Sequence, residues 1–259
     1  MHTPLVSVLT TAYNREAFIA ESIESVLSST FTDFELLVVD DGSKDNTVAI
    51  AKKYEKLDRR VKVYVNEKNL GDYLNRNRAA SYATGKFVKY LDSDDYLYSH
   101  GLQVMVYSME KFPEAGFGVC SKEDNYFNPL PVCISPRQIY LEHFNGYQHF
   151  FRAPGSAIIN KAAFDKVGGF TGKRYIGDIE LWLTLAQQYA MVKFQGGLYC
   201  SRDHNNSEGA SENKSEAERL RENLIQSYLL SPHCPISQQE VTGSYKYQLK
   251  KKLKKFFKN

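Results

Sequence analysis

The sequence predicts an α/β protein built on a mostly parallel sheet with helices flanking it. Short apolar runs rich in β-branched residues alternate with amphipathic segments of helical length through the first hundred residues. Strands and helices that alternate in this order form parallel sheets with right-handed crossovers. The composition, 42% hydrophobic and 24% charged over 259 residues, is that of an ordinary globular protein.

The first half of the chain supplies four strands and three helices. Each predicted strand is a short apolar run, and the strands are expected at residues 6–10, 35–40, 61–65 and 87–91. The helices are expected at residues 16–28, at 73–83, and from a cap at Ser43 or Asp45 to about residue 56. Polar residues follow all four strands, and ligands of such sheets bind beyond these carboxyl ends. We therefore expect one crevice where the four strand ends converge.

The second half is less regular. Residues 121–136 are rich in Asn and Pro and predict a loop, whereas residues 155–160 predict a strand. Helices are expected at 178–189 and 216–230, and the polar segment 201–215 between them is a candidate lid.

Bulk features exclude several classes of protein. No apolar run reaches the roughly 18 residues of a transmembrane helix, and the N-terminus lacks the pattern of a signal peptide. The four cysteines are widely spaced without a CxxC pair, which favours reduced thiols in a cytoplasmic protein over a zinc site. Residues 244–259 contain seven lysines and no acidic residue, so the rest of this +3 chain is acidic on balance. That distribution argues against nucleic-acid binding by the fold itself.

The most informative segment, residues 89–96, reads KYLDSDDY, an apolar strand that runs into three carboxylates. Asp92, Asp94 and Asp95 repel one another at a strand end unless a cation lies between them. Carboxylate oxygens suit Mg²⁺ or Mn²⁺, and such a cation can hold a diphosphate. The alternative is an Asp-rich turn with a helix cap at Ser93 or Asp94.

Two further sets of polar residues lie at predicted strand and helix ends. Asp40 and Asp41 follow a buried strand, where they form either a tight turn or a carboxylate site for a nucleoside. Arg76 and Arg78 are two positions apart and cannot share a helix face, so one of them can face the crevice and a diphosphate. No GxGxxG follows the first strand and no P-loop occurs, which disfavours hydride transfer and P-loop phosphoryl transfer.

The second half offers candidates for catalysis. Asp178 opens a predicted helix, where a carboxylate is either a cap or a rigid general base, and Glu180 follows it. Trp182 is either a core residue or a sugar platform, that is, an aromatic ring on which a sugar stacks. Arg202 and His204 precede the polar segment, where His204 is either a surface residue or a group that closes over a bound metal or phosphate.

An ordered set of short motifs gives the chain a family resemblance. They are VSVLTTAYN at 6–14, FELLVVDDGS at 34–43, NLG at 69–71, RN at 76–77, DSDD at 92–95, GGF at 168–170, DIELW at 178–182 and RDH at 202–204. Over residues 4–211 the chain resembles the family 2 glycosyltransferases, inverting enzymes of the GT-A fold. The resemblance implies a nucleotide-sugar-binding half at 1–100, an acceptor-binding half of the same domain at 101–215, and a C-terminal helix with a basic tail at 216–259.

The resemblance also implies roles for matching residues. The donor nucleotide, a UDP-sugar, would be held by Thr11, Tyr13, Asp40, Asp41, Arg76, Asp92, Ser93 and Asp94. Asp92 and Asp94 match the DxD motif that holds a divalent cation, with Asp95 beside them and His204 near the metal or diphosphate. Asp178 matches the catalytic base. One departure is that residues 72–78 read DYLNRNR, where many members have small residues before Arg-Asn, which leaves open whether Arg76 or Arg78 reaches the nucleotide.

The expected function is therefore metal-dependent transfer of a sugar to a hydroxyl of a glycan or lipid-linked glycan in cell-envelope polysaccharide biosynthesis. A sugar-nucleotide nucleotidyltransferase is the first alternative, although the Gly-rich basic loop it usually needs after the first strand is missing. A non-catalytic sugar-nucleotide binding module is the second alternative.

The basic tail has a pattern of its own. On a helix, its apolar residues form one stripe among lysines: Leu249, Leu253, Phe256 and Phe257. This pattern predicts docking on an anionic membrane surface. The competing interpretation is a disordered or body-packed tail.

Overall fold

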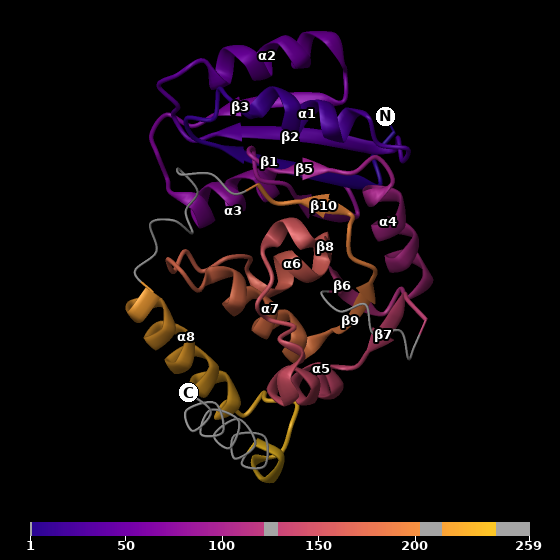
Figure 1. Ribbon diagram of the computed structural model, residues 1–259, viewed down its shortest axis with the longest axis vertical. Coiled ribbons are helices and arrows are strands. Elements are labelled where there is room, and N and C mark those ends of the chain that lie inside the picture. The colour runs from indigo at the N-terminus through magenta and orange to yellow at the C-terminus, as the bar shows by residue number, and fades with distance from the viewer. Residues whose placement is uncertain (1, 122–128, 203–213, 242–259) are drawn as a thin grey trace, which may run out of the picture.

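The computed structural model describes residues 2–121, 129–202 and 214–241 (Figure 1). The strands are β1 Val6–Ala12, β2 Phe34–Asp40, β3 Val61–Val65, β4 Phe87–Tyr90, β5 Tyr96–Leu97, β6 Ala115–Cys120, β7 Val132–Ile134, β8 Ala157–Asn160, β9 Ala190–Phe194 and β10 Tyr199–Cys200. The helices are α1 Ile19–Leu27, α2 Thr47–Leu57, α3 Asp72–Tyr82, α4 Gly101–Lys111, α5 Pro136–Glu142, α6 Lys161–Val167, α7 Gly177–Gln188 and α8 Lys214–Leu229. A π-helical turn at His143–Tyr147 and a 3₁₀ turn at Pro154–Ser156 complete the regular structure.

One eight-stranded sheet, in the order β3-β2-β1-β4-β8-β6-β9-β7, runs through the described chain. Strands β1 to β4 pair in parallel through the crossovers α1, α2 and α3, which confirms the α/β prediction for the first half. Strand β8 then enters antiparallel between β4 and β6, and β7 closes the far edge antiparallel to β9. The sheet is therefore mixed, and strands from both halves of the chain share it.

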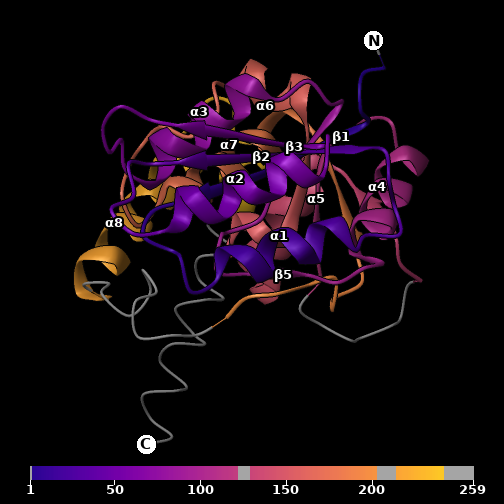
Figure 2. The same cartoon turned by 90° about the horizontal axis from the view of Figure 1, so that it is seen from above.

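Helices cover both faces of the sheet. Figure 2 shows α3 and α6 on one side of β1 and β2, and α1 and α4 on the other. Alternate residues of a strand point to opposite faces, so Leu9 and Leu37 pack under α3 while Val8 and Leu36 pack under α1. No helix in the described ranges is long and apolar enough to cross a membrane.

Several predicted boundaries are corrected by the structure. Helix α1 begins at Ile19 rather than residue 16, because Arg15 and Phe18 form a turn in which the Arg15 carbonyl accepts the Phe18 and Ile19 N–H groups. Asn46, rather than Ser43 or Asp45, occupies the N-cap position of α2, but its side chain forms no cap hydrogen bond. Asp45 still contributes, because its carboxylate accepts the Thr47 N–H at 3.0 Å.

The second half contains elements that the sequence pattern missed. The predicted loop at 121–136 includes β7, and the predicted strand at 155–160 begins as the 3₁₀ turn before it becomes β8. Strand β6 reads AGFGVC, and its two glycines interrupt the apolar run. Residues 203–213 and 242–259, which include His204, most of the predicted lid and the predicted tail helix, lie outside the described residues.

Candidate active site

The carboxyl ends of β1, β2 and β3 meet at one edge of the sheet, as the strand order predicts. The Asp41 N–H donates to the Ala12 carbonyl at 2.8 Å, and the Asn66 N–H donates to the Asp40 carbonyl at 2.9 Å. The Asn66 amide in turn donates to the Asp41 carboxylate at 2.8 Å. Polar groups from three strand ends therefore lie together in a fixed arrangement at the edge where the sequence predicts a crevice.

Asp40 and Asp41 have different local tasks. The Asp40 side chain is buried and accepts the Gly42 and Ser43 N–H groups at 3.0 and 2.8 Å, so its carboxylate builds a tight turn. Gly42 has φ +82°, the left-handed conformation that such a turn requires. The Asp41 carboxylate instead accepts the Gly71 N–H at 2.9 Å and orders the segment that leads into α3.

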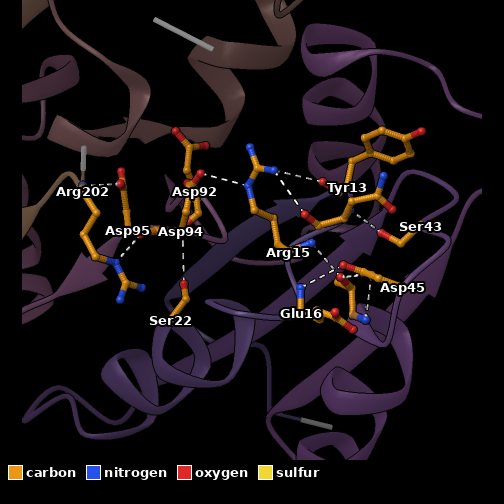
Figure 3. Close-up of polar contacts among 12 residues, drawn as sticks. Tyr13, Arg15, Glu16, Ser22, Ser43, Asp45, Asp92, Asp94, Asp95 and Arg202 are labelled. Carbon is orange, nitrogen blue, oxygen red and sulfur yellow. Dashed lines mark hydrogen bonds and ion pairs between the residues drawn. The ribbon is translucent and has the colours of Figure 1, made fainter. Parts of the chain in front are cut away.

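Two arginines neutralise the two carboxylates of the DxD motif. Arg76 Nη2 lies 2.7 Å from Asp92 Oδ1, and its Nε lies 2.9 Å from Asp72 Oδ1 one helical turn earlier. Arg15 Nε donates to Asp94 Oδ2 at 2.9 Å, and its Nη1 donates to the Tyr13 carbonyl at 3.3 Å (Figure 3). Sequence reasoning missed Arg15, although a basic residue just past the end of β1, at the same sheet edge as the carboxylates, is a usable signal.

The structure distinguishes the two arginines of α3. Arg76 is 6% exposed, and within the described chain its buried Nη1 has no hydrogen-bond partner. Arg78 is exposed and its guanidinium lies 5.0 Å from the Tyr82 ring centre, away from the carboxylates. A buried guanidinium N–H without an acceptor is costly, so the orphaned Nη1 is a donor that an anionic ligand beside Asp92 could satisfy.

Asp95 and Lys89 lie behind the motif. Asp95 is 5% exposed and accepts the Arg202 N–H at 3.1 Å, while Arg202 Nε donates to the Asp94 carbonyl. Burial, with the Asp92 charge adding to it, raises the pKa of Asp95 to about 7. Lys89 is fully buried and donates to the carbonyls of Tyr90 and Gly155, and burial lowers its pKa to about 8. Asp95 and Lys89 thus tie the motif to the chain around it.

Thr11, Tyr13 and Ser93 complete the expected donor side. Thr11 lies at the partly exposed end of β1, Ser93 is buried within the motif, and Tyr13 is 44% exposed. In Figure 3, Arg15 lies between Asp94 and Tyr13. A half-exposed aromatic ring beside a polar strand end can stack on a planar base.

Asp178 is the second residue of α7 and is only partly exposed. Its Oδ1 accepts the Ile179 N–H at 2.8 Å. Burial raises the pKa of this carboxyl to about 6, against the opposing effects of the Ile179 N–H, Arg76 and Arg221. A rigid carboxylate with a pKa close to neutrality is suited to accept a proton.

The other residues predicted near Asp178 have structural tasks. Glu180 is buried, bonds to Thr171 and lies 2.7 Å from Lys173. Trp182 is fully buried, stacks on Phe117 and donates its indole N–H to the Arg152 carbonyl at 2.8 Å. The sugar-platform interpretation of Trp182 is therefore wrong, because a ring without exposed surface cannot contact a ligand.

The donor set can be compared with what a divalent cation needs. In the ranges that the structure describes, no group of three or more His, Cys, Asp or Glu side chains could hold a metal by itself. Mg²⁺ sites commonly use one or two carboxylates and complete their shell with substrate phosphates and water. Asp92 and Asp94, with the anion site at Arg76 beside them, fit that type of site.

Comparison with known proteins adds an independent finding. The model of the family described as "Glycosyl transferase family 2" matches residues 7–168, more than half of the chain. Five curated relatives that the chain matches are covered over 28 to 60% of their own length.

Two of the relatives have names that state both the sugar transferred and the acceptor. The chain is 33% identical over 195 residues to the GalNAc(5)-diNAcBac-PP-undecaprenol beta-1,3-glucosyltransferase of Campylobacter jejuni, which covers 71% of this chain and 60% of the relative. It is 43% identical over 107 residues to the UDP-Glc:alpha-D-GlcNAc-diphosphoundecaprenol beta-1,3-glucosyltransferase WfgD of Escherichia coli, covering 41% of this chain and 42% of the relative.

Solved structures share the fold at low sequence identity. TarS of S. aureus in complex with UDP-GlcNAc superposes with a TM-score of 0.67 and 22% identity over 88% of this chain and 67% of that one. The mannosyltransferase PcManGT of Pyrobaculum calidifontis, in complex with GDP-Man and Mn²⁺, superposes with a TM-score of 0.66 and 17% identity over 94% of this chain and 74% of that one. At these identities the likeness establishes the GT-A fold and nothing finer.

Proposed function

The chain belongs to glycosyl transferase family 2, and on this premise we propose that it transfers a sugar from a UDP-sugar to a hydroxyl of a lipid-linked glycan. One observation carries the proposal. The orphaned Arg76 Nη1 beside Asp92 provides an anion site, and Arg76 also acts electrostatically on Asp178, a carboxylate with a pKa near 6. Sugar transfer needs a site that holds the leaving diphosphate next to a base that accepts the proton of the attacking hydroxyl, and Arg76 and Asp178 would supply the two.

The donor would bind across the ends of β1, β2 and β4. We propose that Thr11, Tyr13 and Asp41 hold the nucleoside while Arg76 holds the diphosphate. Asp92 and Asp94 would hold a divalent cation, Mn²⁺ or Mg²⁺, with His204 as a further candidate ligand. The chemistry that such a cation supplies is neutralisation of charge on the departing diphosphate.

Asp178 would act as the general base. An ionised Asp178 accepts the proton of the acceptor hydroxyl while the hydroxyl oxygen bonds to the anomeric carbon from the face opposite the diphosphate. Because the bond to the diphosphate breaks as the new bond forms, the configuration of that carbon inverts. Arg76 stabilises the negative charge on the leaving group and keeps Asp178 ionised.

The pKa of Asp178 predicts the pH dependence of turnover. The base works only when deprotonated, and burial raises its pKa to about 6. We therefore expect kcat to be at its plateau above that value and to fall as the pH drops through about 6. A kcat profile measured between roughly pH 4.5 and 8 checks this. A kcat that stays nearly flat down to pH 4.5, as the ordinary aspartate pKa of about 3.9 would give, would contradict the assignment.

The acceptor proposal draws on the two named relatives, both of which act on undecaprenol-linked glycans by name. A lipid-linked acceptor would place the reaction at a membrane surface, and we propose that residues 244–259 bring the chain there. Their seven lysines are expected to contribute about 1 kcal/mol each near an anionic surface. Deleting these residues should abolish co-sedimentation with phosphatidylglycerol vesicles and leave UDP binding unchanged. Full-length protein that stays in the supernatant at low salt would refute the docking role.

Measuring product release separates the proposal from its two alternatives. A glycosyltransferase should release UDP from a UDP-sugar much faster with a lipid-linked glycan acceptor than without it. A nucleotidyltransferase would instead consume a nucleoside triphosphate and release pyrophosphate. A binding module would bind UDP-sugar and release neither product, and either of these last two results would overturn the proposed function.

A further inference from the structure

The loop after β1 presents Arg15 in a fixed direction. The Asn14 N–H donates to the Ser43 hydroxyl at 2.8 Å, and the Arg15 N–H donates to the Thr47 hydroxyl at 2.7 Å. The Asn14 side-chain carbonyl accepts the Lys44 N–H at 2.8 Å. These bonds join the loop after β1 to the loop after β2, so the backbone that carries the Arg15 side chain is held on both strands.

From this loop the Arg15 guanidinium crosses the sheet edge to Asp94, 79 residues further along the chain. Its Nε lies 2.9 Å from Asp94 Oδ2, and the two side chains are 23% and 15% exposed. Its Nη1 donates to the carbonyls of Tyr13 and Asn14 at 3.3 and 3.2 Å (Figure 3). A pair shielded in this way is screened less by salt than a surface pair. Arg15 is therefore a resident counter-ion of the second carboxylate of the DxD motif.

The first carboxylate of the motif is paired in the same way, because Arg76 Nη2 lies 2.7 Å from Asp92 Oδ1. Each carboxylate proposed to hold a divalent cation thus already has a guanidinium partner. A cation at Asp94 Oδ2 and the Arg15 guanidinium would repel each other strongly where water is mostly excluded. Asp94 therefore has to give up Arg15 before it can ligate a cation, and the guanidinium then needs another anion.

The proposed donor supplies that anion. The forked N–H groups of a guanidinium fit phosphate oxygens as well as they fit a carboxylate. Arg15 lies between Asp94 and Tyr13, which is proposed to hold the nucleoside, so it is already beside the proposed diphosphate site (Figure 3). Its bonds to the backbone carbonyls of the loop after β1 do not depend on Asp94.

We propose that Arg15 exchanges partners: it holds Asp94 in the protein alone and passes to the donor diphosphate when Asp94 ligates a divalent cation. The proposal rests on the proposed function, to which the cation and the UDP-sugar both belong. It gives Arg15 two opposite effects. Arg15 opposes binding of the cation alone, because it competes for Asp94. It favours binding of the nucleotide once the cation is in place, because it is then a donor to the phosphates.

The first effect is tested with Mn²⁺ and no nucleotide, by following the paramagnetic resonance signal of unbound Mn²⁺ in a titration of the full chain. Arg15→Met removes the competing charge and should tighten the Kd for Mn²⁺ roughly tenfold, within the usual range of such couplings. Arg15→Lys keeps the charge and should bind Mn²⁺ as weakly as the natural protein. Arg60→Met is the matched control, because Arg60 pairs with Asp58 at 2.7 Å and with similar exposure at the loop between α2 and β3.

The second effect is tested by calorimetric UDP titrations at saturating Mn²⁺. Arg15→Met should weaken UDP binding roughly tenfold, the size of a lost hydrogen bond to a charged group. Arg60→Met should leave this Kd unchanged. If Arg15→Met does not fold without metal, which thermal unfolding shows, Arg15→Gln replaces it, because its amide removes the charge and can still donate to Asp94.

The opposite signs of the two changes separate the exchange from simpler roles. A residue that only repels the cation would tighten Mn²⁺ binding and leave UDP binding unchanged. A residue that only binds phosphate would weaken UDP binding and leave Mn²⁺ binding unchanged. A merely structural residue would lower the melting temperature and change neither Kd. Any of these three results would overturn the exchange while leaving the proposed function in place. If the natural protein and the variants bind no Mn²⁺ even with UDP, the proposed cation site itself fails and the exchange fails with it.

Discussion

Asp178→Asn is expected to lower kcat by roughly 10²- to 10⁴-fold, the size of a lost general base, while leaving UDP affinity unchanged. Asparagine keeps the volume of the side chain and can still accept the Ile179 N–H that holds Oδ1 at 2.8 Å. It cannot accept a proton from the attacking hydroxyl. Steady-state rates and UDP titrations on the same protein preparation measure both quantities.

Glu180→Gln is the comparison for that variant. Glu180 is two residues further along α7, but its carboxylate is buried and paired with Lys173 at 2.7 Å. Its replacement should lower the melting temperature and leave kcat near that of wild type. Near-normal turnover of Asp178→Asn, together with a large loss in Glu180→Gln, would move the base to Glu180.

Asp94→Ala is expected to remove the effect of divalent cations on UDP binding and to reduce turnover to background. In the natural chain we expect Mn²⁺ to tighten UDP binding, because a cation held by Asp92 and Asp94 offsets the repulsion between carboxylates and diphosphate. Chelator should abolish turnover, and added Mn²⁺ or Mg²⁺ should restore it. Calorimetric UDP titrations with and without Mn²⁺ test the binding half independently of activity.

The matched control is Asp165→Ala, which removes an exposed carboxylate of α6 whose partner is Lys161 on the same helix. This variant should retain the full dependence of UDP binding on Mn²⁺. If UDP affinity and turnover of the natural protein are both indifferent to chelator and to Mn²⁺, the cation site is wrong. The orphaned Nη1 of Arg76 would then remain as the anion site by itself.

The first half of the fold could be predicted because its signals are local. Each strand of the parallel unit is a short apolar run, and the order of strands and helices then determines which ends meet. The convergence of Asp41, Asn66 and Asp94 at one edge follows from that order alone. In the second half the helices expected at 178–189 and 216–230 are confirmed as α7 and α8, but β6 was missed because glycines break its apolar run. The antiparallel direction of β8 was missed as well, because strand direction has no periodic signature.

The candidate site was predictable in its residues but not in its contacts. The sequence motifs indicated that the carboxylates at 92–95 and at Asp178 belong to the site. That Arg76 rather than Arg78 is the buried arginine depends on which face of α3 packs on the sheet. The ion pair between Arg15 and Asp94 joins segments far apart in the chain, so only the packed structure reveals it. Trp182 is likewise a core residue because of tertiary packing that no local pattern encodes.

The anomeric configuration of the product is the most direct test of the account. It can be measured by NMR after incubation of the protein with an α-linked UDP-sugar, a lipid-linked glycan and Mn²⁺. A single displacement assisted by one base, Asp178, predicts that the transferred sugar is β-linked. It also predicts that the mass of the acceptor increases by that of one sugar residue. An α-linked product would contradict the account, because retention requires a second displacement or a same-face route that Asp178 as general base does not provide.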